Sequence, residues 1–147
     1  MRRPATPVGI GMTLCNRAAY LNEAVESLLA QSHREFTLVL VDDGSTDETE
    51  RLARAFEQRD PRVQYVRCAE RRGMVAAWRT AFEQASPEGV RYFAWASDHD
   101  RWHPRWLQTL LETLEEHPDV VLAYPLTQRI AADTTAPRAP DGSARAG

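Results

Sequence analysis

The sequence lacks lysine altogether, and all 18 of its basic residues are arginines. This excludes a P-loop phosphotransferase, because the Gly-X-X-X-X-Gly-Lys motif needs a lysine on the nucleotide phosphates. A haloacid-type phosphatase and a receiver-type signalling domain also need a lysine, and both place their acidic residues after the first strand of the sheet. A receiver-type domain is therefore only a remote alternative for this chain.

Cysteines and long apolar runs are also scarce. The two cysteines, Cys15 and Cys68, lie far apart and lack metal-ligand spacing, so neither a disulfide scaffold nor a zinc site is expected. No apolar run approaches the roughly 20 residues that span a bilayer, and no signal-peptide core follows Arg2 and Arg3. With a net charge of only −3, the 147-residue chain has no nucleic-acid footprint. We expect a cytoplasmic protein without a membrane segment or a nucleic-acid partner.

Short apolar runs alternate with helical stripes along most of the chain. Five strands are expected, at residues 8–12, 36–41, 63–66, 90–96 and 120–124. Helices are expected between them, the second of which should begin at a capping box formed by Ser45 and Glu48. This alternation predicts an α/β fold with a Rossmann-like, mainly parallel sheet and flanking helices. Residues 131–147 lack any periodicity and are expected to form a disordered tail.

Polar loops follow three of the expected strands. Asn16 follows the first strand, the pair Asp42 and Asp43 follows the second, and Asp98 and Asp100 follow the fourth. Ligands of parallel α/β sheets bind outside the carboxyl ends of the strands. These loops are therefore expected to share one crevice.

Asp98 and Asp100 have two explanations. In an extended segment, residues i and i+2 point to the same side, so both carboxylates can face one ligand while His99 points away from them. Two oxygen ligands suit Mg²⁺ or Mn²⁺, which takes its remaining ligands from water and substrate phosphates. A polar turn before a helix explains the same residues without any ligand, and the triplet alone leaves both possibilities open.

The Asp42-Asp43 pair also has a structural explanation. An aspartate followed by Gly and Ser forms a good turn, but the turn does not need a second aspartate, and adjacent carboxylates at the end of a buried strand need partners. Three arginines, Arg71, Arg72 and Arg79, could hold a diphosphate through their guanidinium groups or could simply lie in solvent.

Taken together, these motifs resemble family 2 glycosyltransferases, which are inverting enzymes of the GT-A fold. The family's opening strand, Tyr-Asn turn, helix and Asp-Asp-Gly-Ser-Thr-Asp motif are similar to MTLCNRAAYLNEAVESLLAQSHREFTLVLVDDGSTDET, and its Asp-X-Asp loop is similar to FAWASDHDRWHPRWL. The resemblance spans residues 8–130 and implies a partial nucleotide-sugar-binding domain over residues 1–130. The implied substrate is a nucleoside-diphosphate sugar, most often a UDP-sugar, whose sugar is transferred to an acceptor hydroxyl.

The resemblance also implies roles for individual residues. Asp42 would accept a hydrogen bond from the nucleotide base, Asp98 would face the ribose and diphosphate, and Asp100 would bind a divalent Mn²⁺ or Mg²⁺ together with Asp98. Arg79 is included among the substrate-binding residues, although the family usually has Asn there. The base and ribose would be lined by a segment that comprises Thr13, Leu14, Cys15 and Asn16. Within this segment, Cys15 stands where the family usually has tyrosine.

Length is the largest departure from the family. Family members continue into an acceptor-binding half that supplies the Asp or Glu which deprotonates the acceptor, and the last residues of this chain supply no such base. We therefore expect a donor-binding portion truncated before the acceptor half, with apolar surface exposed where that half would pack. The general base and the acceptor stay unidentified, and the alternative is a catalytically inactive nucleotide-sugar-binding module.

Overall fold

A computed structural model of the chain describes residues 6–130. The chain divides into a compact unit that ends at Thr109 and a second unit that begins at Leu110. The tail expected at residues 131–147 lies outside the described residues. Within residues 6–130, no helix has the length and apolar character needed to cross a membrane.

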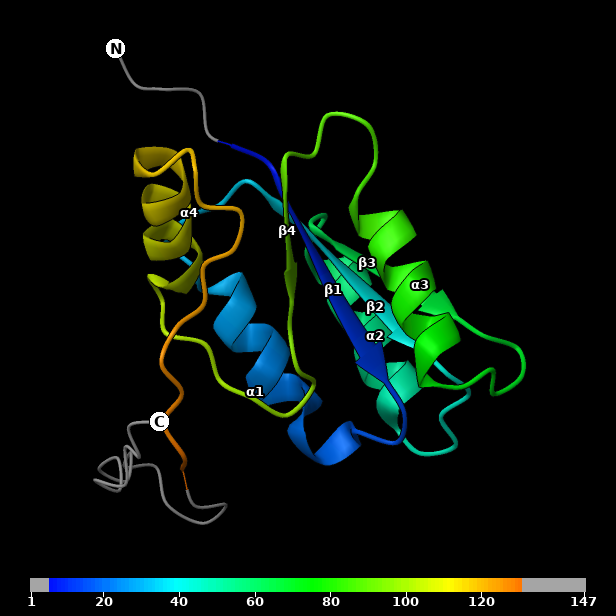
Figure 1. The fold of residues 1–147 in the computed structure, drawn as a ribbon. Helices are drawn as coiled ribbons and strands as arrows, with labels where there is room; N and C mark the ends of the chain where they lie inside the picture. Colours follow the sequence, from blue (N-terminus) through cyan, green and yellow to red (C-terminus); the bar gives the residue numbers. More distant parts are fainter. Residues whose placement is uncertain (1–5, 131–147) are drawn as a thin grey trace, which may run out of the picture. The chain divides into compact units, whose positions relative to one another are not determined.

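The first unit contains a parallel sheet whose strand order is β3-β2-β1-β4 (Figure 1). The central strands are buried along almost their whole length, as their continuous apolar sequences require. This sheet confirms the predicted α/β fold with a parallel, Rossmann-like arrangement. The strands are β1 (Val8–Leu14), β2 (Phe36–Asp42), β3 (Val63–Arg67) and β4 (Tyr92–Trp95).

The helices of this unit cover both faces of the sheet (Figure 1). They are α1 (Ala18–Leu29), α2 (Thr49–Arg59) and α3 (Met74–Ala85), and α3 packs on β1 and β2. The chain moves from β1 to β2 to β3 and then returns to place β4 beside β1. Because βαβ connections are right-handed, this reversal puts α3 on the face opposite α1 and α2. The carboxyl ends of β1 and β4 therefore diverge at a topological switch point, where α/β sheets bind ligands.

Glycines in β1 allow α3 to approach the sheet closely. A Cβ atom on Gly9 would lie 1.8 Å from the carbonyl oxygen of Ala85, and one on Gly11 would lie 3.2 Å from the Cβ of Ala81. The facing side of α3 is correspondingly built of buried alanines. This close packing holds α3 in place beside the carboxyl end of β1.

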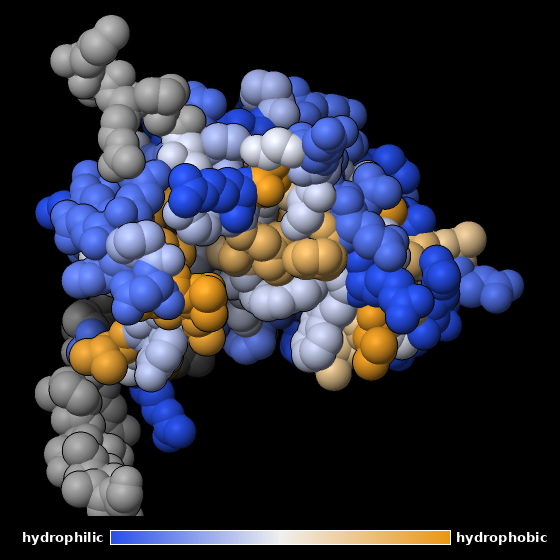
Figure 2. All heavy atoms as spheres, turned by 45° about the horizontal axis from the view of Figure 1, so that its top comes forward, coloured by the Kyte–Doolittle hydropathy of each residue, from blue (hydrophilic) through white to orange (hydrophobic). Residues whose placement is uncertain are grey.

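The prediction of a fifth strand was wrong. Residues 120–124 form no strand, and Val121 and Leu122 are 97% and 72% exposed. An apolar run becomes a strand only where a neighbouring strand satisfies its backbone hydrogen bonds, and the described part of the chain provides none here. On the face shown in Figure 2, hydrophobic residues reach the surface among hydrophilic ones.

The predicted capping box at the start of α2 was also wrong. The helix begins at Thr49, and the side chain of its N-cap residue, Glu48, makes no capping hydrogen bond. Instead, the hydroxyl of Ser45 accepts a hydrogen bond from the backbone N–H of Asn16 at 2.9 Å, and Asp47 Oδ1 accepts one from the N–H of Thr49 at 3.0 Å. The serine thus joins the loops after β1 and β2, a long-range contact that local spacing does not reveal.

Candidate functional site

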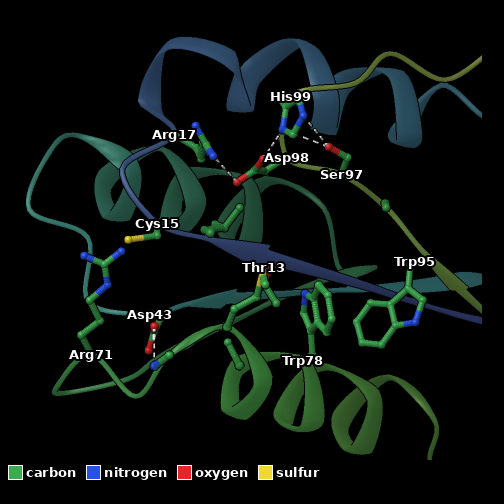
Figure 3. A pocket seen from close by; sticks show the side chains of 15 residues that line it. Thr13, Cys15, Arg17, Asp43, Arg71, Trp78, Trp95, Ser97, Asp98 and His99 are labelled. Carbon is green, nitrogen blue, oxygen red and sulfur yellow. Dashed lines mark hydrogen bonds and ion pairs between the residues drawn. The ribbon is translucent and has the colours of Figure 1, made fainter.

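A cavity of about 670 Å³ opens at the switch point between β1 and β4, within the first unit (Figure 3). Its volume falls in the range of roughly 300–1,000 Å³ that is typical of small-molecule sites. The end of β1, the turn after β2, the loop before α3, the first turns of α3 and the loop after β4 all contribute to its wall. The polar and charged residues on the wall are Thr13, Cys15, Arg17, Asp43, Arg71, Ser97, Asp98 and His99.

Asp98 is buried on the cavity wall and has two cationic or ionisable neighbours. Its Oδ2 lies 3.1 Å from Arg17 Nε, and its Oδ1 accepts a hydrogen bond from His99 Nδ1 at 2.7 Å (Figure 3). The expectation that His99 points away from the aspartates was wrong. Residues 98 and 99 form a turn rather than an extended segment, so side chains do not alternate there. Asp100 is exposed and is not part of the cavity wall.

Asp42 and Asp43 face different surroundings. The side chain of Asp42 is fully buried away from the cavity, and it accepts hydrogen bonds from the N–H of Ser45 at 2.8 Å, from Tyr65 Oη at 2.7 Å and from Arg67 Nη1 at 3.1 Å. Burial and the neighbouring Asp42 carboxylate raise the pKa of Tyr65 far above its usual value, so Tyr65 stays a donor. The base-binding role expected of Asp42 stays a prediction.

Asp43, by contrast, lies on the cavity wall (Figure 3). Its two oxygens accept hydrogen bonds from the backbone N–H groups of Arg72 at 2.6 Å and Gly73 at 2.9 Å. This carboxylate therefore holds the loop before α3 against the end of β2. Asp43 was not among the predicted binding residues, although successive residues of a strand point to opposite sides and only one of the two aspartates could face the crevice.

The remaining predicted residues divide into two groups. Thr13, Leu14 and Cys15 line the cavity, as the carboxyl end of β1 leads directly into it. Asn16 does not line it, because its Oδ1 accepts a hydrogen bond from the N–H of Thr46 at 2.8 Å and so joins two loops. Arg79 is exposed and also lies outside the cavity wall.

Two arginines on the cavity wall were not predicted to bind substrate. Arg17, which follows β1, was not among the predicted binding residues, and Arg71 was passed over in favour of Arg79, although Arg71 lines the cavity and Arg79 does not. Figure 3 shows the Arg17 side chain beside Asp98, whereas the Arg71 side chain extends away from Asp43 in this view. Asp98 thus has a guanidinium partner, whereas Asp43 is held by backbone N–H groups. Guanidinium groups such as those of Arg17 and Arg71 can bind an anion.

The cavity wall offers few protein ligands for a divalent cation. Among residues 6–130, no group of three His, Cys, Asp or Glu side chains could hold a metal ion. The Asp98 carboxylate offers hard oxygen atoms beside the cavity, and Mg²⁺ or Mn²⁺ is often bound through one or two carboxylates and substrate phosphates. Such an ion would take most of its ligands from water and from the bound substrate.

Comparisons with known proteins identify relatives of this chain. The sequence profile described as Glycosyl transferase family 2 matches residues 10–141. TuaG of Bacillus subtilis, a glycosyltransferase provisionally assigned to teichuronic acid biosynthesis, is 34% identical over 101 residues, which cover 69% of this chain and 39% of TuaG. The glycosyltransferase GlyG of Streptococcus pneumoniae is 28% identical over 116 residues, which cover 78% of this chain and 38% of GlyG.

Solved structures show the same fold. S. aureus TarS superposes with a TM-score of 0.67 at 22% identity, over 77% of this chain and 20% of TarS. The mannosyltransferase PcManGT from Pyrobaculum calidifontis, solved with GDP-Man and Mn²⁺, superposes with a TM-score of 0.64 at 25% identity, over 77% of this chain and 33% of PcManGT. The chain thus spans about two-fifths or less of the length of these relatives. Because the family profile covers most of its residues, the chain belongs to glycosyl transferase family 2.

Proposed function

We propose that this chain is the donor-binding portion of a glycosyltransferase and binds a nucleoside-diphosphate sugar in the cavity between β1 and β4. One observation carries the proposal: the switch-point cavity brings the carboxylates of Asp43 and Asp98 together with the guanidinium groups of Arg17 and Arg71. Guanidinium groups bind phosphates in a bidentate manner, and carboxylates accept hydrogen bonds from bases and riboses. A cavity of about 670 Å³ has room for such a ligand.

The related structures support this ligand class. S. aureus TarS residues 1–349 were solved in complex with UDP and with UDP-GlcNAc, and PcManGT with GDP-Man. We therefore propose a nucleotide sugar, with a UDP-sugar as the first candidate. In this arrangement, Thr13, Leu14 and Cys15 line the base and ribose, while Arg17 and Arg71 attract the diphosphate.

A divalent ion belongs to the proposal. Asp98 and Asp100 would hold Mn²⁺ or Mg²⁺, and the ion would supply positive charge that stabilises the departing nucleoside diphosphate. The Mn²⁺ in the PcManGT structure supports the ion, but the exposed position of Asp100 means that its side chain would have to turn toward the cavity. Arg17 already contacts Asp98 and would share the neutralisation of the diphosphate.

Transfer itself requires an acceptor hydroxyl and a base. We propose inverting transfer, with both the base and the acceptor site supplied by residues beyond those that match here, because the relatives are more than twice as long as the matched region. A domain over residues 1–130 and a cytoplasmic location are part of the same proposal. The alternative is a nucleotide-sugar-binding module without catalytic activity.

Calorimetric titration with UDP, with and without MnCl₂, tests the proposal. We expect binding that Arg71→Ala weakens about tenfold, since a phosphate contact would be lost. Arg79→Ala provides a matched control, because Arg79 is an exposed arginine outside the cavity wall, and it should leave the affinity unchanged. Equal losses in both variants, or no binding of UDP at all, would contradict the proposed site. A radiolabelled sugar-transfer assay then separates an enzyme from an inactive module.

The role of the ion has its own test. Asp100→Asn should remove most of the difference in UDP affinity between MnCl₂ and EDTA, because it takes away one of the two proposed carboxylate ligands. Equally strong binding of UDP in the presence of EDTA would show that the metal role assigned to Asp98 and Asp100 is wrong.

A further inference from the structure

Two tryptophans form an exposed aromatic wall on one side of the cavity. The ring centroids of Trp78 from α3 and Trp95 from β4 lie 5.9 Å apart (Figure 3). Trp78 is 44% exposed and Trp95 is 47% exposed. Both line the same cavity as Asp43, Asp98 and Arg71. This pair is called the aromatic wall below. Large indole side chains left half exposed on the wall of a cavity commonly mark a binding surface.

The aromatic wall is held from behind by other rings. Phe93 packs edge-on against Trp95, with centroids 4.7 Å apart and an interplanar angle of 83°, and Phe82 packs edge-on against Phe93 at 4.9 Å. Gly11 makes room for these rings, because a Cβ atom there would lie 3.0 Å from both Phe93 and Trp95. The packing therefore restricts the orientation of the Trp95 indole before any ligand binds, which lowers the entropy cost of binding.

We propose that the aromatic wall stacks against a pyranose ring of the substrate. This inference rests on the proposed nucleotide-sugar site and specifies which part of a substrate this wall contacts. The C–H groups on one face of a pyranose are apolar and weakly positive, and they pack on the electron-rich face of an indole. The charged part of the substrate is then bound by the arginines and carboxylates elsewhere on the cavity wall.

The geometry of the two rings favours a sugar over a nucleobase. The planes of Trp78 and Trp95 are tilted by 43°, so a flat base can lie parallel to only one of them. A puckered pyranose presents C–H groups in several directions and can contact both. The pyranose could be the sugar of the donor or a unit of a carbohydrate acceptor, and the two sources give different results in the experiment below.

The test uses calorimetry on the wild-type chain and two matched leucine variants. Trp78→Leu keeps an apolar side chain with good helix propensity but removes the aromatic face. Tyr20→Leu is the control, because it removes an equally exposed aromatic ring from α1, and Tyr20 neither lines the cavity nor packs on the aromatic wall. Circular dichroism and thermal melts establish that both variants fold. The probes are UDP, UDP-GlcNAc, UDP-glucose, GDP-mannose and a free N-acetylglucosamine trisaccharide.

If the donor sugar stacks on the aromatic wall, Trp78→Leu weakens the binding of at least one nucleotide sugar about five- to tenfold and changes UDP affinity less than about twofold. If an acceptor unit stacks there, the same variant weakens trisaccharide binding and spares the nucleotide sugars. Tyr20→Leu should behave like the wild type in either case.

Several results would overturn the inference. Trp78→Leu could weaken UDP and the nucleotide sugars equally, which would indicate a stacked base. Trp78→Leu could leave the affinity for every probe unchanged, which would be expected if another polypeptide segment covers the wall. Alternatively, the wild-type chain could bind the nucleotide sugars no more tightly than UDP and fail to bind the trisaccharide. Normal UDP binding combined with one of these results refutes the aromatic wall alone, whereas a failure of UDP to bind refutes the proposed function. Trisaccharide binding without UDP binding would support the wall independently.

Discussion

Arg17 and Asp98 form an ion pair between the loops that follow β1 and β4, with Arg17 Nε 3.1 Å from Asp98 Oδ2. The two residues are 81 positions apart in sequence, and both line the cavity. The pair therefore joins the two strand ends that create the switch point. It also means that a cation approaching Asp98 would compete with a guanidinium group already in place.

Breaking this ion pair should affect ligand binding more than stability. Asp98→Asn removes a charge from the cavity but keeps the shape of the side chain. Because Arg17 is half exposed, the ion pair contributes about 1 kcal/mol or less to folding. We expect a small change in melting temperature and an about five- to tenfold loss in Mn²⁺-dependent UDP affinity. The measurements are a thermal melt and calorimetry. A large stability loss with unchanged UDP affinity would make Asp98 a structural residue.

The adjacent aspartates should differ sharply when each is replaced by asparagine. Asp42→Asn puts a neutral amide among Tyr65, Arg67 and the N–H of Ser45, and we expect it to lower the free energy of unfolding by about 2–4 kcal/mol. Asp43→Asn should cost about 1–2 kcal/mol, since an amide oxygen can still accept from the loop before α3. Urea unfolding measures both values.

Nucleotide binding by the same two variants then separates their roles. Calorimetry at a temperature where both variants are folded should show a loss of UDP affinity for Asp43→Asn and little change for Asp42→Asn, because only Asp43 lines the cavity. If Asp42→Asn instead abolishes binding while the protein stays stable, the base contact assigned to Asp42 from the sequence is correct.

Close packing of α3 on β1 predicts different costs for two glycine substitutions. In Gly9→Ala the new methyl group would lie 1.8 Å from the backbone oxygen of Ala85, so the helix itself would have to move, and we expect a loss of about 3 kcal/mol or more. In Gly11→Ala it would lie 3.0 Å from the ring atoms of Phe93 and Trp95, which can shift, and a loss of about 1–3 kcal/mol is expected. Urea unfolding of the two variants compares them. Equal stability of Gly9→Ala and the wild type would show that α3 does not pack on β1 as described.

Asp60 should make the stability of the protein depend on acid pH. The hydrogen bond from Arg62, at 2.7 Å from Nη2 to Oδ2, outweighs burial and lowers the pKa of Asp60 from 3.8 to about 2. Because the folded state favours the ionised carboxylate, this stabilisation is complete above about pH 4 and is lost as the pH falls through 2. A shift of this size corresponds to about 2 kcal/mol.

Unfolding free energies at pH 5, 3 and 2 measure this contribution. Asp60→Asn should be less stable than the wild type at pH 5, and the difference between the two proteins should shrink toward pH 2. A difference that stays constant over this range would show that the Asp60–Arg62 pair does not shift the pKa.

The order of strands and helices could be predicted from the sequence because it depends on local patterns. Continuous apolar runs identified β1 and β2, and apolar stripes at helical spacing identified α1 and α3. The ordered motifs also identified the family, which the family profile confirms. The prediction of a fifth strand failed because an apolar run carries no information about whether another strand lies beside it.

The composition of the site depended on contacts between distant residues. Spacing in the sequence located the Asp42-Asp43 pair, but the direction of each side chain at the end of β2 decided that Asp43 lines the cavity while Asp42 is enclosed by Tyr65 and Arg67. Likewise, the turn at residues 98 and 99 brought His99 to Asp98.

By itself, then, the sequence determined the family, the parallel α/β fold and the loops that carry the polar residues, because short-range periodicity and motif order are written along the chain. The tertiary structure decided which side chains meet in the cavity and which are enclosed in the protein. Trp78 illustrates the difference: an apolar stripe at helical spacing does not show what a residue contacts, and the path of β4 places Trp78 beside Trp95 on the cavity wall. The physical reason is that burial and hydrogen-bond partners are set by elements far away in sequence, and these meet only when the sheet is assembled.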